Sequence, residues 1–254
     1  MIKLKSPDEI KLLKEGGKIL ASVLDTVKKE VREGITTNDL NKMAEDLIIS
    51  AGGEPSFKNY GDSDNPYPSG LCTSVNHELV HGIPSEYILK NGDIISLDVG
   101  MQYPKENGLY TDMATTVPVG KIDKKTKDLL KVTKNSLDIW IKNIKAGKNL
   151  IDIASKVQKY IEKNGYSVVR DLVGHGVGHA VHEEPQIPNY YIPSFDLELK
   201  EGMVLALEPM VAVGDFHVIT EDDGWTVSTL DKSLTAHYEH TIAVTKHGCD
   251  VITK

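Results

Sequence analysis

The spacing of apolar residues near the start of the chain predicts two helices. Apolar residues recur every three or four positions between residues 6 and 30, which is the repeat of one helix face. Ser6 is a good helix cap, and Pro7 suits a first helical turn. The same pattern follows residues 34–37 and runs to Gly52-Gly53. We therefore expect a pair of amphipathic helices before residue 54.

A second pair of helical patterns occupies residues 123–146 and 150–164. A shift of 113 positions aligns the two regions without a gap and matches Gly34 with Gly147, Asp39 with Asp152, Leu40 with Ile153, and Gly52 with Gly165. Identity is slight, so chance similarity between amphipathic helices is the alternative explanation. We expect two halves, each a helix pair followed by strands, that contribute residues to one shared centre.

Strand-like segments after each helix pair carry acids in apolar surroundings. The segment DIISLDVG (residues 93–100) follows an Asn-Gly turn signal, and Asp98 shares a pleat face there with Ile94 and Ser96. Three further acids lie in similar segments: Asp112, Glu208 and Glu239. A single acid in a strand usually faces solvent. Four such acids favour a common site, because buried carboxylates need a partner or a metal.

The segment GHGVGHAVHEEP (residues 174–185) adds imidazoles to this set. His175 and His182 lie on a backbone in which every second residue from 174 to 178 is glycine. That alternation favours an extended backbone that other groups can approach closely. The G-x-G-x-G spacing matches no nucleotide-binding motif. The two histidines are therefore candidates to face a metal or a substrate.

Charge balance indicates what could hold these groups together. Four carboxylates crowded into one site repel one another, and two divalent cations would balance their charge. The donor set is rich in oxygen, with one imidazole and no thiolate. It suits Mn²⁺, Fe²⁺ or Co²⁺ better than a closed structural zinc site. Two such ions bridging a water would lower its pKa to about 7, so metal-assisted hydrolysis is the predicted chemistry.

Composition describes an ordinary globular chain of 254 residues, with 40% hydrophobic and 26% charged residues. We expect a single domain over residues 1–254, since no linker or low-complexity tract interrupts it. Only two cysteines occur, Cys72 and Cys249, which favours a reducing compartment. The first residues lack a secretory apolar segment and no run could span a membrane, so we expect a cytoplasmic protein. A net charge of −8 disfavours a specific nucleic-acid partner.

The ordered motifs of the chain resemble those of type I methionine aminopeptidases, in the pita-bread fold family. They are SPDEIKLLKEGG, TSVNHELVHGIP, DVG, YTDMATT, GHGVGHAVHEEPQIPNY, LALEPM, DDGWTV and AHYEHT. They cover nearly the whole chain in the family's order. The resemblance implies an α+β fold in which two pseudo-symmetric helix pairs cover a curved antiparallel sheet. The site would lie at the centre of that sheet.

The resemblance also implies roles for individual residues. Five residues would bind two divalent ions: Asp98, Asp112, His175, Glu208 and Glu239, with Asp112 and Glu239 bridging. His81 and His182 would bind or polarise the substrate, and Glu208 would handle a proton of the bridging hydroxide. Tyr67, Cys72 and Trp225 would line an apolar pocket for a methionine side chain.

The implied activity is removal of the initiator methionine from nascent polypeptides when the next residue is small and uncharged. The expected partners are nascent N-termini, with the ribosome as the candidate place of action, and we expect a monomer. Three features depart from the family: NYGDSDNPYP is longer than the usual approach to the Cys72 strand, MQYPKENGLYT is longer than in the shortest members, and Val181 stands where some relatives have an aromatic residue. They concern the pocket shape rather than the chemistry.

Three alternatives and several histidines remain to be weighed. A proline-directed relative generally carries an extra N-terminal domain, and a metal-free binding module would be expected to lose ligands. A serine or cysteine hydrolase lacks support, because no G-x-S-x-G motif is present. The remaining histidines without a suggestive setting are expected to lie on the surface or form local hydrogen bonds: His77, His217, His237 and His247.

Overall fold

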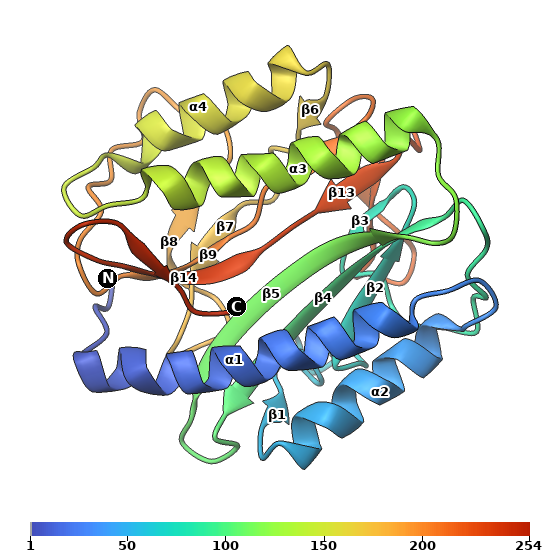
Figure 1. Ribbon diagram of the computed structural model, residues 1–254, viewed down its shortest axis with the longest axis horizontal. Helices are drawn as coiled ribbons and strands as arrows, with labels where there is room; N and C mark the ends of the chain where they lie inside the picture. Colours follow the sequence, from blue (N-terminus) through green and yellow to red (C-terminus); the bar gives the residue numbers. More distant parts are fainter. Residues whose placement is uncertain (1) are drawn as a thin grey trace.

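The computed structural model describes residues 2–254, and Figure 1 shows two helix pairs arranged around antiparallel strands. The helices are α1 (Pro7–Glu30), α2 (Thr37–Ser50), α3 (Lys124–Asn143) and α4 (Leu150–Lys163). All four predicted helices are confirmed to within a few residues. Among residues 2–254, no helix combines the length and the apolar composition needed to cross a membrane.

Short polar side chains start the helices where the sequence predicted them. The Ser6 hydroxyl accepts the Glu9 backbone N–H at 3.3 Å, and the Glu9 carboxylate accepts the Ser6 N–H at 2.7 Å. Thr36 and Asp39 form the same reciprocal arrangement before α2. Each arrangement satisfies backbone donors that the first turn of a helix leaves free.

The predicted repeat is present in the backbone. Helices α2 and α4 both contain 14 residues, and their first residues are 113 positions apart. Gly34 and Gly147, which precede these helices, have positive φ angles of 88° and 80°. The N-cap residues Thr36 and Asn149 each make an isolated antiparallel bridge to the segment before the next main strand. The two halves therefore repeat a helix–turn–helix unit and its attachment to the sheet.

Every strand pairing in the described chain is antiparallel. The first half contains β1 (Glu54–Pro55), β2 (Leu71–Val75), β3 (Glu78–Val80), β4 (Ile94–Tyr103) and β5 (Leu109–Pro118). The second half contains β6 (Ser167–Val168), β7 (Gly174–Gly176), β8 (Glu183–Ile187), β9 (Val204–Leu207), β10 (Met210–Ala212), β11 (Val218–Thr220), β12 (Val227–Thr229), β13 (Thr235–His237), β14 (His240–Val244) and β15 (Cys249–Val251).

Two principal sheets follow the halves of the chain. In the first, β4 pairs with β1, β2 and β5, and in the second the order is β15-β14-β9-β7-β8. Two three-stranded sheets, β13-β10-β6 and β11-β12-β3, complete the arrangement. The principal sheets meet along β5 and β14, where the Glu239 N–H donates to Ala114 O at 2.9 Å. Thr241 Oγ1 likewise accepts the Asp112 N–H at 2.9 Å.

Each helix pair covers one principal sheet and buries a separate apolar core. Residues of α1 and α2 cluster with β2, β4 and β5, and residues of α3 and α4 cluster with β6, β8, β9, β10, β13 and β14. Figure 1 shows α1 and α2 (blue) along one side of the strands and α3 and α4 (green to yellow) along the other. The helices cover one face of the curved sheet, which leaves the strand residues on its other face free to form a site.

Candidate metal centre

The first half supplies two acids from adjacent strands. Asp98 on β4 pairs in register with Ala114 on β5, and Asp112 lies two residues from Ala114 on the same strand. Because alternate residues share a sheet face, the two carboxyl groups are diagonal neighbours on that face. Both residues are buried, with exposed fractions of 8% and 4%.

The second half supplies two acids and an imidazole. Leu207 pairs with His240, and continuing that register places Glu208 opposite Glu239. His175 on β7 pairs with Ala206, which makes its side chain a diagonal neighbour of Glu208. Glu208 and Glu239 lie in the breaks after β9 and before β14 rather than within strands. The sequence had placed them inside strands, so that detail was wrong.

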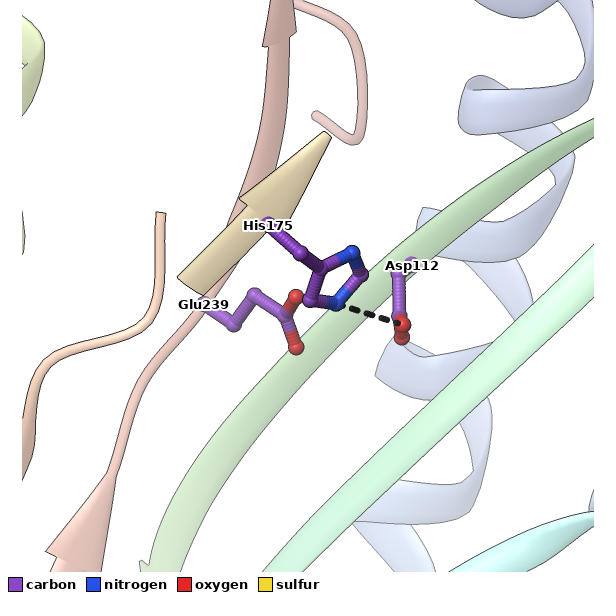
Figure 2. A group of neighbouring side chains, drawn as sticks. All are labelled: Asp112, His175 and Glu239. Atoms are coloured by element: carbon purple, nitrogen blue, oxygen red, sulfur yellow. Dashed lines mark ion pairs between the residues drawn. The ribbon is translucent and has the colours of Figure 1, made fainter. Parts of the chain in front are cut away.

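The groups converge where the two principal sheets meet. Ligand atoms of Asp112, His175 and Glu239 all lie within 4.8 Å of one another, and Figure 2 shows these side chains pointing toward a common point. His175 Nε2 is 3.9 Å from Asp112 Oδ2 and 3.4 Å from Glu208 Oε1. Asp98 lines the same cavity. All five predicted ligands therefore surround one small space, although they come from distant parts of the chain.

Unpaired oxygens in this space fit a divalent cation. Asp98 Oδ1, Asp112 Oδ1 and Glu239 Oε1 are buried without a hydrogen-bond partner. Burial raises the pKa of Asp98 to about 6. Burial and then the charges of neighbouring carboxylates hold the pKa of Asp112 and of Glu239 well above the usual range. A divalent cation would satisfy the unpaired oxygens and stabilise the ionised form of each acid.

The imidazole of His175 is oriented for the same purpose. Its Nδ1 lies 2.9 Å from the Gly176 carbonyl oxygen, and a carbonyl can only accept, so Nδ1 carries the hydrogen. The Nε2 lone pair then faces Asp112 and Glu208. Burial, followed by the proximity of His182, lowers the pKa of His175 to about 3, so the ring is neutral. A neutral imidazole held by a backbone carbonyl is the usual form of a metal-binding histidine.

A cavity of about 630 Å³ opens above the acids. His81 and His182, the two histidines expected to bind substrate, both line it. The His182 ring centroid is 4.3 Å from that of His175, which places His182 beside the acid cluster. Burial is the main cause that lowers the pKa of His81 to about 4. His81 has a positive φ of 58°, at the turn that follows β3. Both histidines thus face the space that a substrate would occupy.

The three predicted pocket residues also meet in this cavity. Tyr67, Cys72 and Trp225 all line it, and the Tyr67 and Trp225 rings pack edge to face at 5.3 Å. The Tyr67 hydroxyl donates to Gly82 O at 2.9 Å, which fixes the ring. Val181 joins the same apolar cluster. These side chains form an apolar wall of the cavity. The wall lies directly beside a polar floor, which consists of Asp98, Asp112, His175, Glu208 and Glu239.

Some lining residues were not predicted. Phe57 and Tyr60 come from the long segment between β1 and β2, and both line the cavity. The Tyr60 hydroxyl lies 2.6 Å from His182 Nδ1. The sequence singled out NYGDSDNPYP in this segment as longer than in the family but gave no periodicity to orient an aromatic ring. Aromatic residues next to an unusual insertion were the one signal that could have indicated them.

His237 is a correction to the sequence analysis. It was expected on the surface or in a local hydrogen bond, but only 1% of it is exposed and neither ring nitrogen has a hydrogen-bond partner. Its Nε2 lies 3.6 Å from Glu208 Oε2 and 3.9 Å from Glu239 Oε2. The ring therefore lies next to the acid cluster. The signal was its position two residues before Glu239, on the same alternation of the chain.

Comparisons with known proteins agree with this geometry. The model of metallopeptidase family M24 matches residues 11–246. The chain is 45% identical to methionine aminopeptidase of Clostridium perfringens, covering 100% of this chain and 99% of that protein. It is 46% identical to methionine aminopeptidase 1 of Bacillus subtilis, with both covered completely. The crystal structure of methionine aminopeptidase from Thermotoga maritima matches with a TM-score of 0.95 at 44% identity, covering 100% of both chains.

A more distant likeness concerns the fold alone. The Xaa-Pro dipeptidase of Bacillus anthracis matches with a TM-score of 0.77 at 24% identity, covering 99% of this chain and 62% of that one. The identities near 45% over complete chains separate this protein from that relative. The chain belongs to metallopeptidase family M24, with the pita-bread fold, and groups within it with the methionine aminopeptidases.

Proposed function

We propose that this protein removes the N-terminal methionine from nascent polypeptides whose second residue is small and uncharged. One observation carries the proposal: four carboxylates and an imidazole, all of types that bind metals, form the floor of a cavity whose wall is apolar and aromatic. The floor suits hydrolysis of a peptide bond, and the wall suits an uncharged side chain. Family membership supports the same reaction class.

The floor would hold two divalent ions. Four carboxylates and a neutral imidazole balance two dications in charge, and the residues that would bind them are Asp98, Asp112, His175, Glu208 and Glu239. Such ions supply Lewis acidity, which activates water as a nucleophile and polarises the scissile carbonyl. The oxygen-rich donor set favours Co²⁺, Mn²⁺ or Fe²⁺.

The protein's own groups then orient the substrate and move its protons. Glu208 lies 3.4 Å from His175 and faces the cavity, so it can take a proton from the attacking water and pass it to the leaving amine. His81 is neutral because its pKa is low, and a neutral imidazole can donate a hydrogen bond to a carbonyl oxygen as negative charge develops. His182, whose ring lies beside that of His175 on the floor, can donate in the same way.

The wall would select the side chain of the first residue. Tyr67, Cys72 and Trp225 offer aromatic and sulfur surface, which makes favourable contacts with a thioether. A charged side chain would be buried there without a partner, so it should be rejected. A free α-amino nitrogen has a lone pair that a divalent ion on this floor would accept, whereas an acylated nitrogen does not, so the floor favours a substrate with an unblocked N-terminus.

The expected setting follows from the substrate. Nascent N-termini arise at the ribosome in the cytoplasm, and we place the enzyme there as a monomer. Cys72 and Cys249 are both free, which is consistent with a reducing compartment. Nothing in the proposed reaction requires a nucleic acid or a membrane.

Peptide hydrolysis by the Mn²⁺- or Co²⁺-loaded protein tests this function. Met-Ala-Ser should be cleaved, whereas Met-Lys-Ser and N-acetyl-Met-Ala-Ser should not. Efficient cleavage of the acetylated peptide would contradict the role of the free amine. A preference for Ala-Pro over Met-Ala-Ser would instead assign the protein to the proline-directed relatives.

A further inference from the structure

Lys5 is buried in a way that is unusual for a lysine. It is the one lysine among the buried residues of the described chain, and 1% of its side chain is exposed. Its Nζ lies 2.6 Å from Glu183 Oε2, whose side chain is 11% exposed. A desolvated ammonium without a partner would cost several kcal/mol. The N-terminal segment is therefore tied firmly to a residue 178 positions away.

Glu183 uses its other oxygen to close a turn. Glu183 Oε1 accepts the backbone N–H of Ala180 at 2.9 Å and also the backbone N–H of His179. These bonds fold residues 177–182, which connect β7 to β8. His182 is the last residue of that turn and directly precedes Glu183. One carboxylate thus links Lys5 to the backbone that carries His182.

The aliphatic stem of Lys5 also shapes this turn. Gly178 has a positive φ of 132°, and a Cβ placed on it would lie 2.6 Å from Lys5 Cε. The backbone can therefore pass over the lysine stem only because residue 178 is glycine. The glycine alternation seen in the sequence has a local reason at this position.

A second contact holds the other side of the turn. His179 Nε2 lies 2.6 Å from Glu9 Oε1, in the first turn of α1. The Lys5 N–H donates to Gly202 O at 2.8 Å, which fixes the strand-like approach to α1. Lys5 and Glu9 are thus both held in place, and both contact the same turn.

His182 depends on that turn for its position. It is exposed at the rim of the cavity, and its Nδ1 makes one side-chain contact, with the Tyr60 hydroxyl at 2.6 Å. Its backbone leads directly into the residue that Lys5 binds. A shift of the turn would move the imidazole relative to His175, whose ring centroid is 4.3 Å away.

We propose that Lys5 is a positioning residue for His182: the buried Lys5–Glu183 ion pair fixes the turn that presents His182 to the substrate. The inference rests on the proposed function, because it assigns His182 a role in substrate binding. It adds to that function a dependence of the active site on residues 3–9, which lie at the opposite end of the chain from most of the site. Metal binding should not depend on this pair, since Lys5 contacts none of the five candidate ligands.

The test compares Lys5→Met, which keeps the stem but removes the charge, with the conservative Lys5→Arg. Misplacing a substrate-binding group by a fraction of an ångström to 1 Å should lower kcat/KM for Met-Ala-Ser by about 10- to 100-fold in Lys5→Met. Lys5→Arg should restore most of the activity. Metal content should be unchanged in both. Lys14→Met is the matched control, because Lys14 also pairs at 2.6 Å with a distant carboxylate, Asp250, but on the exposed surface.

A double-mutant cycle tests whether Lys5 acts through His182. In a His182→Ala background, adding Lys5→Met should cause little further loss, because the residue that Lys5 positions is already absent. A full, additive loss in that background would overturn the proposal. So would a Lys5→Met variant with the turnover of the Lys14→Met control.

Amide hydrogen exchange gives a readout that does not depend on turnover. In Lys5→Met the backbone amides of His179 and Ala180 should exchange faster, while those of β4 and β5 should not change. If the wild type fails to cleave Met-Ala-Ser, the proposed function is wrong, but this measurement still tests whether the Lys5–Glu183 ion pair fixes the turn. Should Lys5→Met not fold, Glu183→Gln must give the same local increase. Unchanged exchange at residues 179–180 in the folded variant would contradict the inference.

Discussion

The two halves of the chain share a framework but supply different chemistry. Gly92 and Gly202 both have positive φ, 102° and 86°, and each turn leads into a central strand. Six residues after each glycine stands an acid of the cluster, Asp98 in the first half and Glu208 in the second. The central strand β4 pairs with β5, which carries Asp112, and the central strand β9 pairs with β14, which begins directly after Glu239. The repeated backbone therefore accounts for the paired carboxylates.

The difference lies in the strand on the other side of each central strand. In the first half β2 places Cys72 opposite Asp98, whereas in the second half β7 brings His175 beside Glu208. The strand beside the central one thus brings a thiol to the site in the first half and an imidazole in the second. A duplicated framework can therefore place the carboxylates in pairs, while side chains that are not repeated give the two halves different chemistry at equivalent positions.

The largest effect should come from the acids at the join between the halves. Glu239→Ala or Asp112→Ala should release the metal ions, because both carboxylates are proposed to bridge them. Loss of the Lewis acid removes several kcal/mol of stabilisation, so activity should fall by about 10³-fold or more. Metal analysis and turnover of Met-Ala-Ser measure the two losses.

Asp98→Ala is the control within the first half, since it should weaken the binding of mainly one of the two ions. Wild-type metal content and turnover in Glu239→Ala would remove the two-ion model. Equal losses of metal and activity in Asp98→Ala and Asp112→Ala would show that Asp112 contributes no more to metal binding than Asp98 does.

The imidazoles of the second half should separate into two roles. His182→Ala should keep its metal yet lose about 10²-fold in kcat/KM, as expected for removal of one preorganised donor, about 2.7 kcal/mol. His175→Ala should lose metal affinity, because its free Nε2 faces the acids. Metal titration beside steady-state kinetics distinguishes them. The reverse pattern would mean that the two histidines have been exchanged in the assignment.

Much of this molecule could be predicted from sequence, and what could not has physical reasons. Helices α1 to α4 were predictable because their apolar spacing and caps are local. Asp98 was recognisable because an acid within a β-branched run is locally anomalous. His237 was harder to recognise, because its position two residues before Glu239 suggests only a shared face, while its burial depends on the contact between β13 and β10. The side-chain direction of Tyr60 was equally hidden, since an irregular segment has no periodicity.

The apolar wall of the first half should control substrate size rather than chemistry. Cys72→Leu adds bulk beside Tyr67 and should cost about 1–2 kcal/mol for a long first side chain, roughly a tenfold rise in KM for Met-Ala-Ser. Metal content and kcat should stay near the wild-type values. A first residue shorter than methionine should lose less. A change in metal content would contradict this prediction, because it would show that Cys72 supports the metal site as well as the substrate pocket.

The smallest effect tests whether the two frameworks are equivalent. Gly34 and Gly147 have nearly the same positive φ, and a Cβ on either would meet no atom within 4 Å. Gly34→Ala and Gly147→Ala should therefore destabilise only through backbone strain, by about 1–2 kcal/mol. A loss of this size lowers Tm by roughly 2–8 °C in a chain of this length, and activity at 25 °C should not change. Thermal unfolding of both variants in parallel measures the pair. A fall in Tm in only one of the two variants would mean that the equivalent turns contribute unequally to stability. The two halves would then share a backbone shape without sharing its energetics.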